Sequence, residues 1–123
     1  MAAHPFCALV AAGGTGELYS LTPDEHRQVV RTVVEVVRGR VPVIAGVGFG
    51  ATMGRLLARQ AEEAGADGLL MLPPYYVNAD PEGLLEYYRH VAGATSLGVF
   101  PYSRDWVTFT PASLRKLLSL IHI

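Results

Sequence analysis

The sequence predicts an α/β protein built around a parallel β-sheet. Short continuous apolar runs, typical of strands buried on both faces, alternate with segments whose apolar residues recur at helical spacing. Four such strand–helix units follow one another at intervals of about 30 residues. Right-handed crossovers leave two architectures, an open doubly wound sheet or a closed (β/α)8 barrel, and four units are half of such a barrel.

The strands are expected at the four apolar runs Phe6–Ala12, Val41–Val47, Gly68–Leu72 and Ser96–Phe100. Glycine or proline clusters follow the first three runs and favour turns there. No linker or shift in composition divides the chain, so residues 1–123 are expected to form a single domain or part of one.

The segments between the runs carry helix signals. Thr22 precedes Pro23 and is followed by Glu25, the pattern of a capping box, and valines recur at helical spacing after it as a predicted core stripe. Gly39 suits the end of that helix. The other helices are expected over Thr52–Ala64, from Asp80-Pro81 through Tyr88, and from Ala112 to about Leu118.

Composition excludes several classes of partner. The 123 residues are 50% hydrophobic and 17% charged, with a net charge of −1, so the basic excess expected of nucleic-acid or anionic-membrane binding is absent. The single cysteine excludes an internal disulfide and a cysteine-based zinc site. No run is long enough to span a membrane and the first residues lack a signal-peptide pattern, so a soluble cytoplasmic protein is expected.

Unusual residues cluster just after the expected strands. In both parallel architectures the carboxyl ends of the strands form the ligand-binding edge. The four loops there are Gly13–Glu17, Gly46–Gly50, Pro73–Tyr76 and Tyr102–Asp105. The residues of each loop alone could be explained by the needs of a turn. Four such loops on one edge favour a ligand-binding site.

Two of these loops suggest specific ligands. Glycines in Gly13–Glu17 would let backbone N–H groups and the Thr15 hydroxyl hold a carboxylate or phosphate, although a glycine-rich turn explains them too. Gly46–Ala51 reads G-x-G-x-x-A, a dinucleotide fingerprint in form. Asp67, the acidic residue at a suitable distance, lies before the next strand and not at its end, which weakens a nucleotide interpretation.

Two side chains of the last loop could act on a substrate. Tyr102 is either a proton relay or a packing residue, and Arg104 pairs either with a substrate carboxylate or with Asp105. The four histidines lack metal-ligand spacing, so no metal site is expected. Cys7 is expected to be a buried inert thiol, and Glu62 to lie on a solvated helix face.

Four segments in order resemble the dihydrodipicolinate synthase/N-acetylneuraminate lyase superfamily of (β/α)8-barrel Schiff-base lyases and aldolases. They read AAGGTGELYSLTPDEH, RVPVIAGVGFG, GADGLLMLPPYY and PYSRDW. The doubled glycine before TGE and the YxRD stretch are most similar to its 5-dehydro-4-deoxyglucarate dehydratase branch. The resemblance implies decarboxylating dehydration of that sugar diacid to 2,5-dioxopentanoate, with no cofactor.

The resemblance also implies roles for residues. It places Gly14 and Thr15 on the carboxylate of an α-keto acid, with Gly14 standing where relatives have a threonine hydroxyl. It makes Tyr102 the proton shuttle and sends Tyr76 into a neighbouring subunit, which implies a homo-oligomer. Arg104 is taken with these residues as part of the binding site for the keto sugar acid.

The superfamily forms its imine through a lysine on the strand after the helix that follows Tyr102. The only lysine here is Lys116, at a solvent-type position within that helix. The chain is therefore expected to be units two to five of the barrel, a fragment that is inactive alone. Its SLIHI end is expected to be truncated or foreign. The alternatives are a dihydrodipicolinate synthase-like or N-acetylneuraminate lyase-like aldolase, and a non-catalytic α/β module that binds an anion or a nucleotide.

Overall fold

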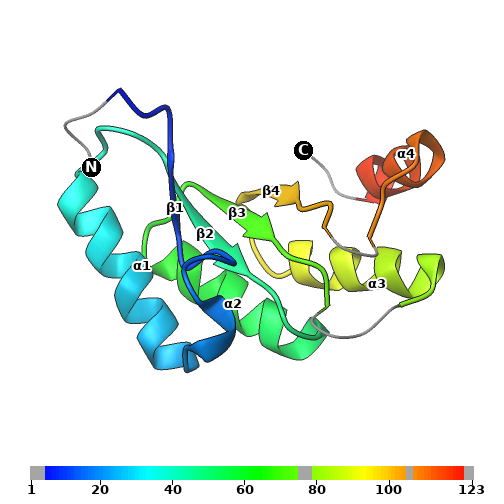
Figure 1. The fold of residues 1–123 in the computed structure, drawn as a ribbon, viewed down its shortest axis with the longest axis horizontal. Helices are drawn as coiled ribbons and strands as arrows, with labels where there is room; N and C mark the ends of the chain where they lie inside the picture. Colours follow the sequence, from blue (N-terminus) through cyan, green and yellow to red (C-terminus); the bar gives the residue numbers. More distant parts are fainter. Residues whose placement is uncertain (1–4, 75–78, 105–106, 121–123) are drawn as a thin grey trace.

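The computed structural model describes residues 5–74, 79–104 and 107–120, and it confirms four consecutive strand–helix units (Figure 1). The strands are β1 (Leu9–Ala11), β2 (Val43–Val47), β3 (Gly68–Met71) and β4 (Gly98–Pro101). The helices are α1 (Pro23–Val37), α2 (Ala51–Glu63), α3 (Pro81–Ala92) and α4 (Pro111–Leu120), with a short 3-10 turn, η1 (Leu18–Ser20), before α1.

The four strands form one parallel sheet whose spatial order follows the chain, β1-β2-β3-β4. One row of the register runs through Ala11, Ala45, Leu69 and Val99. The order of a doubly wound sheet reverses at a switch point, whereas strands of a barrel follow one another without reversal. Within the described residues the order is therefore that of a barrel.

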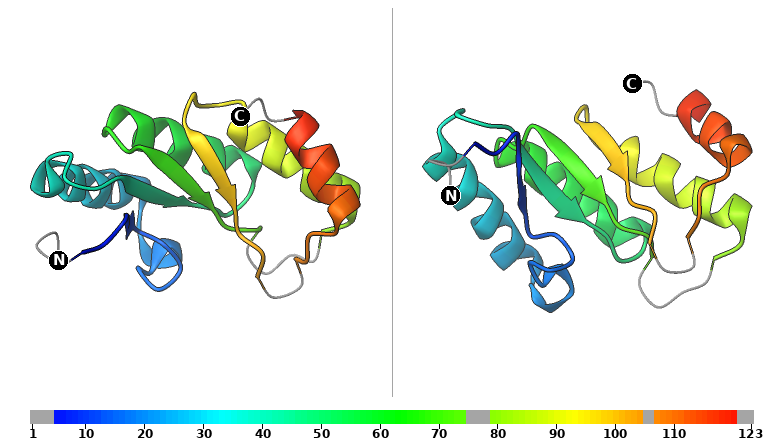
Figure 2. Two further views of the ribbon diagram at one scale, coloured as in Figure 1. Left: turned by 90° about the horizontal axis from the view of Figure 1, so that it is seen from above. Right: turned by 45° about the horizontal axis from the view of Figure 1, so that its top comes forward.

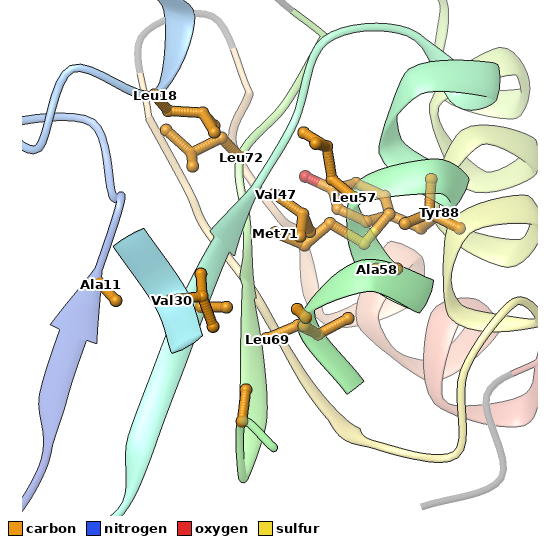
Figure 3. Close-up of a cluster of buried hydrophobic side chains, with 14 of the residues drawn as sticks. Ala11, Leu18, Val30, Val47, Leu57, Ala58, Leu69, Met71, Leu72 and Tyr88 are labelled. Carbon is orange, nitrogen blue, oxygen red and sulfur yellow. The ribbon is translucent and has the colours of Figure 1, made fainter. Parts of the chain in front are cut away.

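Helices α1, α2 and α3 lie along one face of the sheet (Figure 2). On that face Ala45, Leu69 and Met71 are completely buried, and Figure 3 shows Leu69 and Met71 within the core. The apolar runs predicted strands buried on both faces, and this prediction is wrong for the described residues. On the opposite face Val10 and Phe100 are 55% and 56% exposed, because no described helix covers it.

The first strand is shorter than the apolar run predicts. Only Leu9–Ala11 pair with β2, and Phe6 and Cys7 are exposed before it. The prediction of a buried Cys7 is therefore wrong. The apolar run begins before the residues of β1 that pair with β2, so its first side chains are left exposed.

The helix starts follow their local signals. In the capping box of α1, the Thr22 hydroxyl accepts a hydrogen bond from the Glu25 N–H while the Glu25 carboxylate accepts one from the Thr22 N–H. At the start of α3 the Asp80 carboxylate accepts hydrogen bonds from the N–H groups of Glu82 and Gly83. Of the valine stripe, Val30 and Val37 are buried, but Val29 is 37% exposed at the margin of the buried face. No described helix is long and apolar enough to cross a membrane.

Glu62 does not lie on a purely solvated face. Its carboxylate accepts hydrogen bonds from the N–H (3.1 Å) and the hydroxyl of Ser96. These hydrogen bonds hold the pKa of Glu62 below its ordinary value. The end of α2 is thereby tied to the turn that leads into β4, a contact between residues 34 positions apart that helical periodicity does not reveal.

His26 joins α1 to the middle of the sheet. Its side chain is buried, and Nε2 donates a hydrogen bond to the Gly46 carbonyl of β2 at 2.8 Å. Nδ1 is buried without a hydrogen-bond partner among the described residues. Burial lowers the pKa of His26, although the Gly46 carbonyl partly opposes that shift. His26 is therefore a neutral core residue.

The buried neutral His26 makes stability depend on pH. The unfolded chain takes up a proton near the ordinary pKa of 6.5, and the folded chain does so only at lower pH. The free energy of unfolding should therefore fall below pH 6.5, by up to about 1.4 kcal/mol per pH unit. Urea titrations between pH 7.5 and 5.5 check this. His26→Gln keeps a hydrogen-bond donor but cannot take up a proton, so its free energy of unfolding should no longer fall in this pH range. The control His90→Gln, which changes an exposed histidine, should keep the fall. An unchanged pH dependence in His26→Gln would contradict the assignment to His26.

Candidate active site at the carboxyl edge of the sheet

The parallel register brings four loops to one edge of the sheet. They are residues 12–17 after β1, 48–50 after β2, 72–74 after β3 and 102–104 after β4. Gly14 of the first loop lies close to Leu72 and Arg104 of the third and fourth loops, and Leu18 and Tyr19, which follow the first loop, lie close to Gly48 of the second. The predicted clustering of the loops on one edge is thereby confirmed for these residues.

The first loop is a tight turn whose backbone presents several N–H donors. The Glu17 and Leu18 N–H groups donate to the carbonyls of Gly14 and Gly13, each at 3.2 Å. The amides of Gly14, Thr15 and Gly16 make no hydrogen bond with the described residues, and Thr15 is exposed. Such donors suit a carboxylate. Ala12 and Glu17, at the two ends of the loop, have left-handed backbone conformations.

Gly46 explains how this loop is seated. A Cβ added at Gly46 would lie only 2.1 Å from the Ala12 carbonyl oxygen and 2.8 Å from the Gly13 Cα. The loop thus leaves β1 by crossing directly over β2, which requires glycine at this position.

The G-x-G-x-x-A pattern has a packing explanation. Gly46 is covered by the first loop, and a Cβ at Gly48 would lie 3.2 Å from Leu18 and 3.3 Å from the Tyr19 hydroxyl. The space that a pyrophosphate would need beside these glycines is therefore filled by protein. Asp67, whose carboxylate accepts a hydrogen bond from the Val43 N–H at the start of β2, lies at the opposite edge of the sheet. The structure gives no support to a nucleotide site here.

The last loop presents Tyr102 and Arg104. The Tyr102 N–H donates to the Met71 carbonyl at 2.9 Å, which extends the ladder past Pro101, and the Tyr102 side chain is 42% exposed at the edge. Ser103 Oγ donates a hydrogen bond to the Val107 carbonyl, and the Val107 N–H donates one to the Arg104 carbonyl. Arg104 reaches the first loop, because a Cβ at Gly14 would lie 3.1 Å from its Nη1.

Two predicted contacts fall outside the described residues. These are the position of Tyr76 in the third loop and the pairing of Arg104 with Asp105. Of the predicted site residues, the structure brings Gly14 and Arg104 into direct proximity, and it places Thr15 and Tyr102 on the same edge of the sheet.

Two tyrosines that sequence reasoning missed support the edge. Tyr19 Oη donates to the Pro73 carbonyl at 3.5 Å, and its ring packs edge-on against Phe49 at 4.9 Å. Tyr87 Oη of α3 donates to the Leu72 carbonyl at 2.8 Å. The first three loops are therefore joined through side chains. The sequence shows only that a tyrosine lies next to the apolar stripe of a helix. That pattern does not reveal which carbonyl its hydroxyl binds.

No cluster of metal-ligating side chains occurs in the described part of the chain. Lys116 is exposed on α4, where its ammonium group lies 2.8 Å from the Glu82 carboxylate. The prediction of a solvent-type position for this lysine is confirmed.

Comparison with known proteins gives one family. The model of the Dihydrodipicolinate synthetase family matches residues 5–123. A Streptomyces coelicolor protein named "Probable 5-dehydro-4-deoxyglucarate dehydratase 1" is 53% identical over 110 residues, 89% of this chain. A Bradyrhizobium diazoefficiens protein named "Probable 5-dehydro-4-deoxyglucarate dehydratase" is 46% identical over 114 residues, 93% of this chain. The chain spans 35% and 36% of the lengths of these two relatives.

Solved structures agree with the fold. Dihydrodipicolinate synthase from Aquifex aeolicus superposes with a TM-score of 0.88 at 32% identity, over 98% of this chain and 42% of that one. YagE, a family member from E. coli K12 crystallised in complex with pyruvate, gives 0.87 at 30% identity, over 95% of this chain and 41% of that one.

Two adjacent tyrosines allow a matched test of the edge support. Tyr87→Phe leaves the buried Leu72 carbonyl without its donor and should lower the free energy of unfolding by about 1–2 kcal/mol. Tyr88 is fully buried and its hydroxyl has no partner among the described residues, so Tyr88→Phe should be neutral or stabilising. Urea unfolding of both variants measures these free energies. An equal loss of stability in the two variants would contradict the supporting role of Tyr87.

Proposed function

The chain belongs to the dihydrodipicolinate synthetase family, and we propose that it supplies half of the active-site edge of a Schiff-base lyase that converts 5-dehydro-4-deoxyglucarate to 2,5-dioxopentanoate. The observation that carries this proposal is about 50% identity, over nearly the whole chain, to relatives named for that dehydratase. Dihydrodipicolinate synthases of known structure are about 30% identical.

The first loop would hold the substrate's α-keto acid carboxylate. Its donors are the exposed Thr15 hydroxyl and the amides that have no partner among the described residues. Backbone hydrogen bonds within the loop and the contact with Gly46 hold these donors in place. A carboxylate anchored there places the adjacent ketone over the edge of the sheet, where an amine can attack it.

Tyr102 would move protons at the imine. It follows β4 directly, and its partly exposed phenol lies at the same edge as the first loop. A phenol held close to the reacting carbon can donate and accept the protons that imine formation and loss of water require. Tyr76 would act across a subunit boundary in a homo-oligomer. The imine itself withdraws electrons, so the proposed reaction needs no cofactor.

The amine would come from a lysine outside residues 1–123. An imine-forming lysine needs a neutral amine in a desolvated pocket. Lys116 is exposed on α4 and paired with the Glu82 carboxylate, so it does not lie in such a pocket. The chain alone is therefore expected to bind keto acids without turning them over.

A second candidate from the same family is an aldolase of the dihydrodipicolinate synthase type. The 0.86–0.88 TM-scores to such structures favour it as the alternative. Both candidates share the carboxylate anchor and the tyrosine, and they differ in what the rest of the substrate contacts. A non-catalytic anion-binding module remains a third outcome of the test.

A chimera tests the proposal directly. Residues 6–118 of this chain would replace the matching segment of the Streptomyces coelicolor relative, which supplies the remaining units. We expect this chimera to dehydrate 5-dehydro-4-deoxyglucarate and Tyr102→Phe to lower kcat about 10²-fold with a small change in KM. Tyr88→Phe is the matched control and should keep full turnover.

The chimera also separates the alternatives. Condensation of pyruvate with an aldehyde, without dehydratase activity, would favour the aldolase. Pyruvate binding with no imine trapped by borohydride on either chimera or chain would favour the binding module. Full turnover in Tyr102→Phe would show that this tyrosine is a packing residue and not a proton relay.

A further inference from the structure

The sheet ends in two strands that have a neighbour on one side only. Within the described residues β1 pairs with β2 alone and β4 pairs with β3 alone, and all the pairings are parallel. The outer edges of β1 and β4 therefore offer backbone donors and acceptors to another chain, as edge strands do. Because all strands run in one direction, β4 of one copy can pair in parallel with β1 of another copy.

An apolar stripe on α1 lies at one end of the row of helices. Val29 and Val36 on this helix are 37% and 61% exposed. Arg31 and Glu35 of α1 line a groove that is closed on its other side by Glu63 and the residue after it, at the end of α2. At 3.6 residues per turn, the two valines lie on the side of α1 that is turned away from this groove. The valine stripe therefore faces away from α2.

A matching stripe on α4 lies at the other end of the row (Figure 2). Leu114 and Leu118, one turn apart, are 39% and 56% exposed. The α4 residues that contact α3 are different ones, because Lys116 pairs with Glu82 and Ser113 lines a pocket together with residues of α3. The helical period places the two leucines on a side turned away from α3. Each end of the row of helices thus presents exposed apolar side chains beside an edge strand.

The sheet face that no described helix covers is also apolar. Val10 pairs in register with Ile44, and Leu70 with Phe100, all on this face. Val10 and Phe100, on the two edge strands, are the most exposed of the four. In a closed barrel side chains on this face meet those of the opposite strands in a packed interior.

The exposed area of the chain matches what a dimer would bury. The accessible surface is 7454 Å², whereas a compact monomer of 13.2 kDa exposes about 6,400 Å². The excess is about 1,000 Å² per chain. A stable protein–protein interface of standard size takes about 800 Å² from each partner.

We propose that two copies of the 123-residue chain close into one eight-stranded barrel around a two-fold axis. In this dimer β4 of each copy pairs with β1 of the other, and α4 packs against the partner's α1. Four strands in unreversed order from each copy give the eight strands that such a barrel contains. The same junction forms twice, so no edge remains and assembly stops at two copies. The proposal is independent of the reaction and of the subunit boundary proposed for Tyr76.

Two substitutions at the junction test this dimer in the 123-residue chain. Val29 is the seventh residue of α1 and Leu118 the eighth of α4, and both helices follow their strands at the same edge of the sheet, so the two side chains lie at a similar height. Sedimentation equilibrium in a reducing buffer should give a species of twice 13.2 kDa for the wild type. Val29→Glu and Leu118→Glu should each weaken dimerisation at least about tenfold, because each places two unpaired charges in the closed dimer.

A matched control and a charge pair separate the junction from a general effect. Leu56→Glu changes a leucine that is 41% exposed on α2, a helix that has neighbours on both sides, and should leave dimerisation unchanged. The double variant Val29→Lys/Leu118→Glu places opposite charges at each junction and should dimerise more tightly than either of its single changes. All these positions are partly exposed within one copy, so far-UV circular dichroism should remain that of the wild type.

Several outcomes would overturn the proposal. A wild-type chain that stays monomeric at high concentration has no such interface, and an open series of larger species would show that the contact does not close. A dimer that neither Val29→Glu nor Leu118→Glu weakens would be held by stacking of the two uncovered sheet faces. A double variant no tighter than Leu118→Glu alone would contradict the packing of α4 on the partner's α1.

Discussion

The close approach of the first loop to Gly46 is the constraint on which the candidate site depends. Gly46 is held from two directions, by the His26 imidazole on its carbonyl and by the Ala12–Gly13 backbone over its Cα. Because the loop leaves β1 in this way, Leu18 and Tyr19 cover Gly48, and the Tyr19 hydroxyl reaches the third loop at Pro73. One position without a side chain thereby sets the path of the loop that carries Thr15.

The sheet gives the site its surroundings. Helices cover one face, and on the other Val10 and Phe100 remain exposed among the described residues. In a (β/α)8 barrel the uncovered face of such a sheet is the interior, filled by layers of side chains from all strands. The apolar character of this face, its unreversed strand order and the family match agree with four consecutive units of a barrel.

Local features of this fold could be predicted from the sequence. The cap formed by Thr22 and Glu25 depends on four neighbouring residues, and it forms as expected. The alternation of apolar runs and helical stripes was enough to place four units and to bring their loops to one edge. Periodicity alone left two folds, an open doubly wound sheet and a (β/α)8 barrel. The family resemblance indicated the barrel.

Features set by tertiary contacts could not be predicted. Tyr87 and Tyr88 are adjacent on α3, yet one hydroxyl has a carbonyl partner and the other has none among the described residues. Gly46 belongs to a pattern read as a nucleotide fingerprint, and only the path of a distant loop shows why it is glycine. Cys7 was misplaced because hydrophobicity extends beyond the strand.

The stability of Gly46→Ala relative to Gly98→Ala is the most direct measurement of the central constraint. Both changes replace a strand glycine by alanine, so their effects on the unfolded chain match. At Gly98 no atom lies within 4 Å, whereas at Gly46 the new methyl group meets rigid backbone. We predict that Gly46→Ala lowers the free energy of unfolding in urea by about 2–3 kcal/mol more than Gly98→Ala. Equal stability of the two variants would contradict the seating of the first loop on Gly46.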